Sequence, residues 1–259
     1  MTTAPRREEG SSRTQGVFVS FVRLRICTRG TEWRLSRTTI RGLLDRILDD
    51  QHRLLAPHKG RDDFFTFFAA DKALQERDLD TEEILDGIVD GAHDCGIDGI
   101  WSFVDDRYVT ADAHRYLTSR AGTIELVVLQ AKTSAGYQET VFEKLHFHLP
   151  TLLDMSRDED ALGSHTNAKL LERTRRVLHV LENLAASFPR VRVTVIYASK
   201  AAEGPHPNVK AKGDRLKREL SKITSDTEAT IEYLSAAELR ERTARGAKAV
   251  AELVFSETP

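Results

Sequence analysis

The spacing of apolar residues changes repeatedly along the chain, and each change predicts a new element. Spacing typical of amphipathic helices occurs in residues 38–55, 64–75, 81–94, 137–154, 168–187, 208–223 and 236–246. Apolar runs typical of strands occur in residues 17–26, 97–106, 123–132, 190–199 and 229–235. This alternation predicts an α/β protein with a mixed sheet covered by helices on both faces.

The helix expected at residues 81–94 has a defined start and a defined buried side. Asp80 or Thr81 can cap it, because short oxygen-bearing side chains accept hydrogen bonds from the first free amides of a helix. Its apolar residues at helical spacing are expected to face the core, and they are Ile84, Leu85, Ile88 and Val89.

Three segments are expected from the distribution of polar residues. Residues 1–15 are polar and are predicted to be a disordered tail. Residues 16–59 are predicted to form a strand and a helix that extend the main domain, which is predicted to cover residues 60–259. Neither GxxxxGK nor GxGxxG occurs, so the familiar phosphate-binding loops of nucleotide-binding proteins are missing.

The composition of the 259 residues is that of a globular protein, with 40% hydrophobic and 30% charged residues. The net charge of −2 means that binding to a polyanion would need a local basic patch. Two cysteines, Cys27 and Cys95, exclude a disulfide framework and a thiolate metal cage. With no secretory signal and no membrane-spanning apolar run, the sequence predicts a cytoplasmic protein without a membrane partner.

Polar side chains stand where two neighbouring predicted strands would meet. In LVVLQAK (126–132), Gln130 and Lys132 share one face because side chains alternate along a strand. Asp98 lies near the start of the preceding strand, within GIDGI. If the two strands pair antiparallel, the start of one meets the end of the other, and the three side chains converge at one corner of the sheet.

This group has the parts needed for metal-assisted phosphodiester hydrolysis. Mg²⁺ takes oxygen ligands, and Mn²⁺ can replace it at such a site. Asp98, the amide oxygen of Gln130 and a carboxylate of the preceding helix could hold such an ion. Lys132 could activate a water molecule and offset the charge of a phosphate.

The arrangement resembles the PD-(D/E)xK nuclease superfamily, in its Mrr-like form with GID followed by QxK. The segments VDGAHDCGIDGI and QAKTSAGYQE, followed by FPRVRVTVIYASK and KAKGDRLKREL, further resemble the amino-terminal domain of abortive-infection phage-resistance (AIPR) proteins. The resemblance covers residues 60–255 and implies a restriction-endonuclease-like fold. It also implies nucleic acid (DNA or RNA) as a partner, and either a further carboxyl-terminal domain that this chain lacks or a homo-oligomer.

By motif position, the resemblance implies a role for each candidate residue. Asp98 would be the central metal ligand, Gln130 a substitute ligand and Lys132 the catalytic lysine. Glu83 would be the helix acid that completes the ligand set, and Asp94 would support the ligands. Gln130 departs from the usual acid, and a neutral amide binds a divalent ion more weakly, so either the helix acid matters more here or activity is low or lost.

Several of these residues have an alternative structural interpretation. Asp98 could be a turn aspartate between Gly96 and Gly99. Glu83 could close a capping box with Asp80 and take no part in chemistry. His146 and His148, two positions apart on a helix, diverge and do not suggest a metal site.

A group of basic residues follows the strand at 190–199. They form either a surface that tracks a phosphate backbone or a solvated helix face paired with Asp214 and Glu219. The members are Lys200, Lys210, Lys212, Arg215, Lys217 and Arg218.

The residues and the resemblance together imply a metal-dependent nuclease, and the resemblance implies that it acts in anti-phage defence. One alternative is a nuclease-fold module that has lost catalysis and binds or senses nucleic acid. A third option is a purely structural interaction domain.

Overall fold

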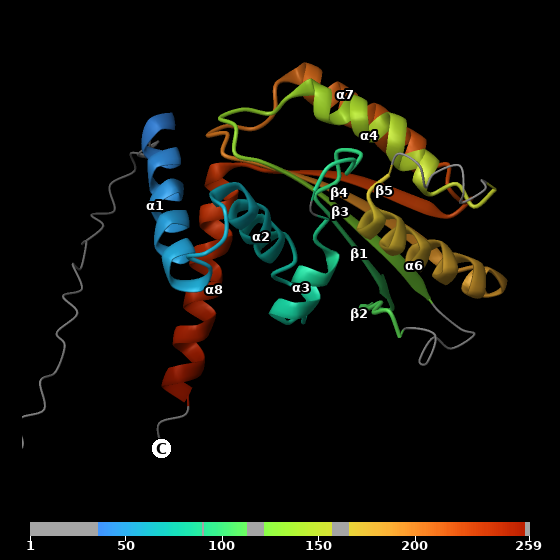
Figure 1. The fold of residues 1–259 in the computed structure, drawn as a ribbon, viewed down its shortest axis with the longest axis horizontal. Coiled ribbons are helices and arrows are strands. Elements are labelled where there is room, and N and C mark those ends of the chain that lie inside the picture. The colour runs from blue at the N-terminus through green and yellow to red at the C-terminus, as the bar shows by residue number, and fades with distance from the viewer. Residues whose placement is uncertain (1–35, 90, 113–121, 157–165, 257–259) are drawn as a thin grey trace, which may run out of the picture. The chain divides into compact units, whose positions relative to one another are not determined.

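A computed structural model of the chain describes residues 36–89, 91–112, 122–156 and 166–256 (Figure 1). The helices are α1 (Arg37–Leu55), α2 (Arg61–Ala73), α3 (Thr81–Gly87), α4 (Glu139–Leu152), α6 (Ala168–Leu184), the short 3₁₀ helix η2 (Ala185–Ser187), α7 (Pro207–Leu220) and α8 (Ala236–Ser256). The strands are β1 (Gly99–Val104), β2 (Arg107–Tyr108), β3 (Thr123–Lys132), β4 (Arg190–Ser199) and β5 (Thr227–Leu234).

The strands form one mixed sheet in the order β2-β1-β3-β4-β5. β1 pairs antiparallel with both β2 and β3, whereas β3, β4 and β5 run parallel to one another. The prediction of an α/β protein with a mixed sheet flanked by helices is confirmed.

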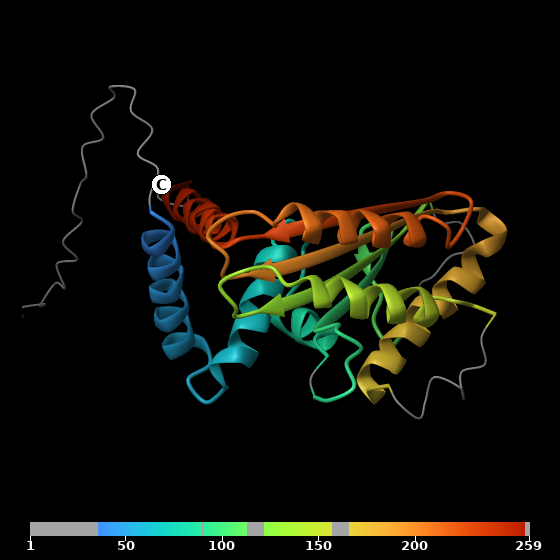
Figure 2. The ribbon, with the colours of Figure 1, turned by 90° about the horizontal axis from the view of Figure 1, so that it is seen from above.

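Helices cover both faces of this sheet and enclose two hydrophobic cores (Figures 1 and 2). The first core lies under α4, α6 and α7, and the second lies under α1, α2, α3 and α8. Side chains of β3 alternate between them: Leu126 and Val128 enter the first core, whereas Val127 and Leu129 enter the second. Burial on both faces explains why this strand is a continuous apolar run.

Helix α3 is shorter than the sequence predicts, because the Trp101 indole takes the Ile84 carbonyl to which a continuing helix would bond. The Trp101 indole donates a hydrogen bond of 3.2 Å to the carbonyl of Ile84, and a Cβ on Gly87 would lie only 2.1 Å from the indole nitrogen. The chain therefore leaves the helix at Gly87, and Ile88 forms a β-bridge with Gly99. The predicted helix is wrong over residues 88, 89 and 91–94. Leu85, expected to be buried, is 38% exposed.

The amino-terminal predictions are only partly covered by the described residues. The expected tail at 1–15 and the expected strand at 17–26 lie outside them. Helix α1 belongs to the same compact unit as the rest, Leu35–Pro259, and its Leu44 and Leu48 are buried in the second core. The compact unit thus begins before the boundary expected at residue 60. The short strand β2 was not predicted.

None of the helices within the described residues combines the length and the apolar character needed to cross a membrane.

Candidate functional site

The start of β1 meets the end of β3, as the sequence predicts. Gly99 pairs with Leu129, so the register continued by one residue places Asp98 opposite Gln130. The Asp98 amide donates a hydrogen bond of 2.9 Å to the Leu129 carbonyl. The side-chain amide of Gln130 donates to Oδ2 of Asp98, and the backbone amide of Ala131 donates to the same oxygen at 2.7 Å.

Asp98, Gln130 and Lys132 all belong to the face of the sheet that α4, α6 and α7 cover. They are in phase with Ile100 of β1 and Val128 of β3, which enter the first core. Gln130 is 1% exposed, whereas Asp98 and Lys132 are half-buried at the rim. The sheet therefore brings an acid, a carboxamide and an amine to one corner, with the charged groups within reach of solvent.

The surroundings of Asp98 make it an unusually weak acid. Burial raises its pKa to about 6 from the ordinary value of 3.8, and the charge of Asp94 adds to this rise. The Ala131 amide, the positive charge of Lys132 and the Gln130 amide all act in the opposite direction. Asp98 is therefore ionised at neutral pH and takes up a proton in mildly acidic solution.

Asp98 has a structural role as well as a possible chemical one. Its Oδ2 accepts a hydrogen bond from the Ala131 amide at the end of β3, which joins two strands and is not the bond to its own turn that a turn aspartate makes. Among the described residues, no hydrogen bond reaches its other oxygen, Oδ1. One oxygen thus fixes the carboxylate while the other remains available to a ligand.

The loop before β1 brings a further lysine to the site. The Asp94 carboxylate accepts a hydrogen bond of 2.8 Å from the Gly96 amide, and Gly96 has a φ of +76°. A Cβ on Gly96 would lie 3.2 Å from Cβ of Lys144 and 3.4 Å from Oε1 of Gln130. The aliphatic part of Lys144, on α4, therefore packs over Gly96 next to the Gln130 amide.

The charges of Lys144 and Asp94 both act on His148. Burial lowers the pKa of His148, the charge of Lys144 lowers it further, and Asp94 acts against both. Sequence reasoning assigned Asp94 a supporting role but missed Lys144. Lys144 could have been found from its position on the helix that directly follows the QAK strand, one helical turn before His148.

The structure gives Glu83 a capping role. The Asp80 amide donates to Oε2 of Glu83 at 3.0 Å, and the Glu83 amide donates to Oδ1 of Asp80 at 2.8 Å, which completes a capping box at the start of α3. Among the described residues, no hydrogen bond or ion pair links Glu83 with Asp98 or Gln130. Within those residues, no three His, Cys, Asp or Glu side chains form a group able to hold a metal ion. Two of the three expected ligands are therefore brought together, and Glu83 is not.

Most of the expected basic surface lies on α7, which packs beside α4 (Figures 1 and 2). Lys212 is paired with two acids of α4, Glu139 at 2.8 Å and Glu143. The remaining basic side chains of this helix are exposed, and they are Lys210, Arg215, Lys217 and Arg218.

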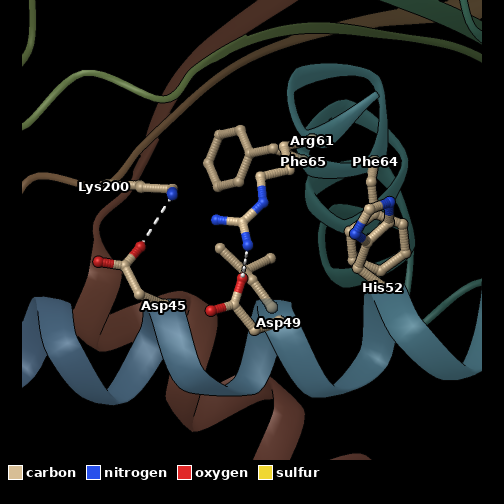
Figure 3. A pocket seen from close by; sticks show the side chains of 8 residues that line it. Asp45, Asp49, His52, Arg61, Phe64, Phe65 and Lys200 are labelled. Atoms are coloured by element: carbon tan, nitrogen blue, oxygen red, sulfur yellow. Dashed lines mark hydrogen bonds and ion pairs between the residues drawn. The ribbon is translucent and has the colours of Figure 1, made fainter. Parts of the chain in front are cut away.

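Lys200 lies apart from the other basic residues. It contacts the helices of the second core, where its ammonium is 2.8 Å from Asp45 of α1 and 5.7 Å from the ring centre of Phe65 (Figure 3). It borders a pocket of about 320 Å³, in which Arg61 also pairs with Asp49 at 3.1 Å. The structure does not place Lys200 with the α7 residues, because the chain after β4 turns toward α1.

No family model, no curated protein and no solved structure matches the chain. Function must therefore be inferred from the chemistry of the site.

Proposed function

We propose that the chain is a metal-dependent nuclease that hydrolyses phosphodiester bonds at Asp98, Gln130 and Lys132. The observation that carries this proposal is the contact of Asp98 with Gln130 at one corner of the sheet, with Lys132 on the same face of β3 and its charge acting on Asp98. Two hydrogen bonds fix the Asp98 carboxylate, and burial fixes Gln130. Such fixed polar groups are what a catalytic site requires.

The oxygen donors of Asp98 and Gln130 fit a hard divalent ion that also takes ligands from the bound substrate. Mg²⁺ is commonly held by one or two carboxylates and completes its shell with water and phosphate oxygens. Oδ1 of Asp98 is one such donor, and a half-turn of the Gln130 amide would present Oε1 as a second. With Glu83 engaged in its cap, this set is small, so we expect Mg²⁺ or Mn²⁺ to bind weakly until a phosphate joins.

The residues of the chain supply position and charge. A bound ion would supply Lewis-acid stabilisation of the phosphate. Lys132 would add positive charge where negative charge develops during hydrolysis. Among the described residues it forms no ion pair, so no contacting carboxylate neutralises it. Asp98 would act in its ionised form, which predominates above pH 6.

The exposed cations of α7 support a polyanionic substrate. They lie on α7, which packs against α4, and a phosphate backbone can contact exposed cations outside the site that holds one phosphate. From the resemblance to AIPR proteins, we further propose that the substrate is phage or host nucleic acid in the cytoplasm and that cleavage belongs to an abortive-infection response.

Cleavage assays with three divalent ions and with a chelator test the proposal. Single- and double-stranded DNA and RNA would be incubated with the chain in Mg²⁺, Mn²⁺, Ca²⁺ or a chelator. We expect cleavage with Mg²⁺ or Mn²⁺ and none with the chelator. Cleavage at an equal rate in chelator would contradict the metal-dependent mechanism.

The second candidate is a module that binds nucleic acid without cleaving it. The observation in its favour is that the assembled ligand set contains a single carboxylate, Asp98, beside a neutral amide. This alternative predicts binding that weakens steeply with salt and no cleavage under any divalent ion.

A further inference from the structure

Helix α4 exposes an aromatic ring close to the candidate site. Phe147 is 74% exposed, and its ring contacts that of His148 with centroids 4.9 Å apart and planes at 87°. Lys144, Phe147 and His148 occupy positions i, i+3 and i+4, so they form one strip on the helix surface. We call these three residues the α4 strip.

The α4 strip is continuous with the site. Lys144 packs over Gly96 beside the Gln130 amide, and Asp94 of the same loop influences the pKa of both Asp98 and His148. The strip therefore borders the corner where a substrate phosphate would lie.

Packing of α4 does not account for the position of Phe147. The residues by which this helix joins the core are Val141, Phe142, Leu145, Leu149 and Leu152. An exposed phenylalanine gains little from folding, because its ring stays in water. An aromatic face combined with a neighbouring cation is the arrangement by which proteins hold unpaired bases and the phosphates that join them.

We infer that the α4 strip binds an unpaired nucleotide next to the phosphate that is cleaved. The base stacks on Phe147, and Lys144 contacts the adjoining phosphate. This inference rests on the proposed nuclease function and adds a substrate class, single-stranded or locally unpaired nucleic acid. Within a duplex, each base face is covered by its neighbour and must be unstacked before a side chain can cover it.

A binding experiment with a stacking-sensitive probe tests the inference. A single-stranded oligonucleotide carrying 2-aminopurine, and the same sequence as a blunt duplex, would be titrated with the full chain in Ca²⁺. We expect wild type to bind the single strand more tightly and to change its fluorescence. Phe147→Ala should weaken single-strand binding at least about fivefold and remove the fluorescence change, whereas Phe147→Trp should retain both.

Phe188 provides the matched control. It is 90% exposed and precedes the start of β4, which pairs with the start of β3, so it lies at the opposite end of these strands from the candidate site. Phe188→Ala removes an equally exposed ring and should leave single-strand binding unchanged.

The outcomes separate the inference from the proposed function. Equal single-strand affinity of wild type and Phe147→Ala, with cleavage that still requires Asp98, would overturn the inference and leave the nuclease proposal standing. Tighter wild-type binding to the duplex would also overturn it. A chain that binds neither probe at low salt would contradict both.

Discussion

Asp98 lies opposite Gln130 where β1 meets β3, and the Gln130 side-chain amide donates a hydrogen bond to the Asp98 carboxylate. A second carboxylate at position 130 would repel the first and raise its pKa further. The amide lowers that pKa instead. Gln130 thus helps to keep a half-buried acid ionised at neutral pH, but contributes no charge toward a metal ion.

Gln130→Glu should strengthen metal binding but make the Asp98 carboxyl harder to ionise. A second carboxylate should tighten Mn²⁺ binding about tenfold at pH 7.5, because affinity for a hard cation grows with ligand charge. The same change should move the acidic limit of cleavage to higher pH, since the paired acids would share a proton. Calorimetric Mn²⁺ titration and a pH–rate profile measure the two effects. Unchanged Mn²⁺ affinity would show that residue 130 is not a ligand.

Asp98→Asn should abolish cleavage and stabilise the fold above pH 6. The pKa of Asp98 is about 6 in the folded state against 3.8 ordinarily, so its contribution to stability is present below pH 4 and lost as pH rises through 6. The variant has no carboxyl group at this position, so it does not lose this stability as pH rises. The free energy of unfolding of the variant relative to wild type should therefore increase by about 1–2 kcal/mol from pH 4 to pH 7. Urea denaturation at both pH values measures this, and a pH-independent difference would contradict it.

Gly96→Ala should destabilise the fold and disturb the site. Gly96 has a φ of +76°, and an added methyl group would press on Lys144 and approach the Gln130 amide oxygen. We expect a loss of about 1–2 kcal/mol in the free energy of unfolding, together with slower cleavage.

Gly42→Ala is the matched control for that substitution. Gly42 lies in α1 with no atom within 4 Å of an added Cβ, so alanine should stabilise the chain by up to about 1 kcal/mol. If Gly96→Ala were as stable and as active as Gly42→Ala, the tight packing at Gly96 would have no energetic importance.

Glu83 should prove structural. Glu83→Gln can still accept the hydrogen bond from the Asp80 amide, whereas Glu83→Ala should cost about 1 kcal/mol of stability. Cleavage rates of both variants, measured below their melting temperatures, should stay within about twofold of wild type. A loss of activity in Glu83→Gln with unchanged stability would restore this residue to the ligand set.

The central strands of the sheet and the contact between Asp98 and Gln130 can be predicted from local sequence pattern. β3 and β4 have the bounds that their apolar runs predict, and the antiparallel pairing of β1 with β3 follows from their proximity in the chain. The pairing alone brings Asp98 to Gln130, which is why the convergence could be anticipated from one sequence.

Features that depend on contacts between distant residues were missed. Helix α3 ends at Gly87 because Trp101, fourteen positions later, takes the Ile84 carbonyl. Lys144 reaches the site because α4 packs back over Gly96. Lys200 turns to Asp45, a residue far away in the chain. Periodicity records which side of an element is buried, but not which partner covers it.

The cleavage rate of Lys132→Ala tests most directly the claim that the corner formed by Asp98, Gln130 and Lys132 is the catalytic site. With Mg²⁺ or Mn²⁺, this variant and Asp98→Asn should each lose at least about a hundredfold in rate while circular dichroism and melting temperature show a folded chain. Lys59→Ala, which removes an exposed lysine between α1 and α2, should cleave at the wild-type rate. Full activity in both Lys132→Ala and Asp98→Asn would show that this corner of the sheet is not the catalytic site.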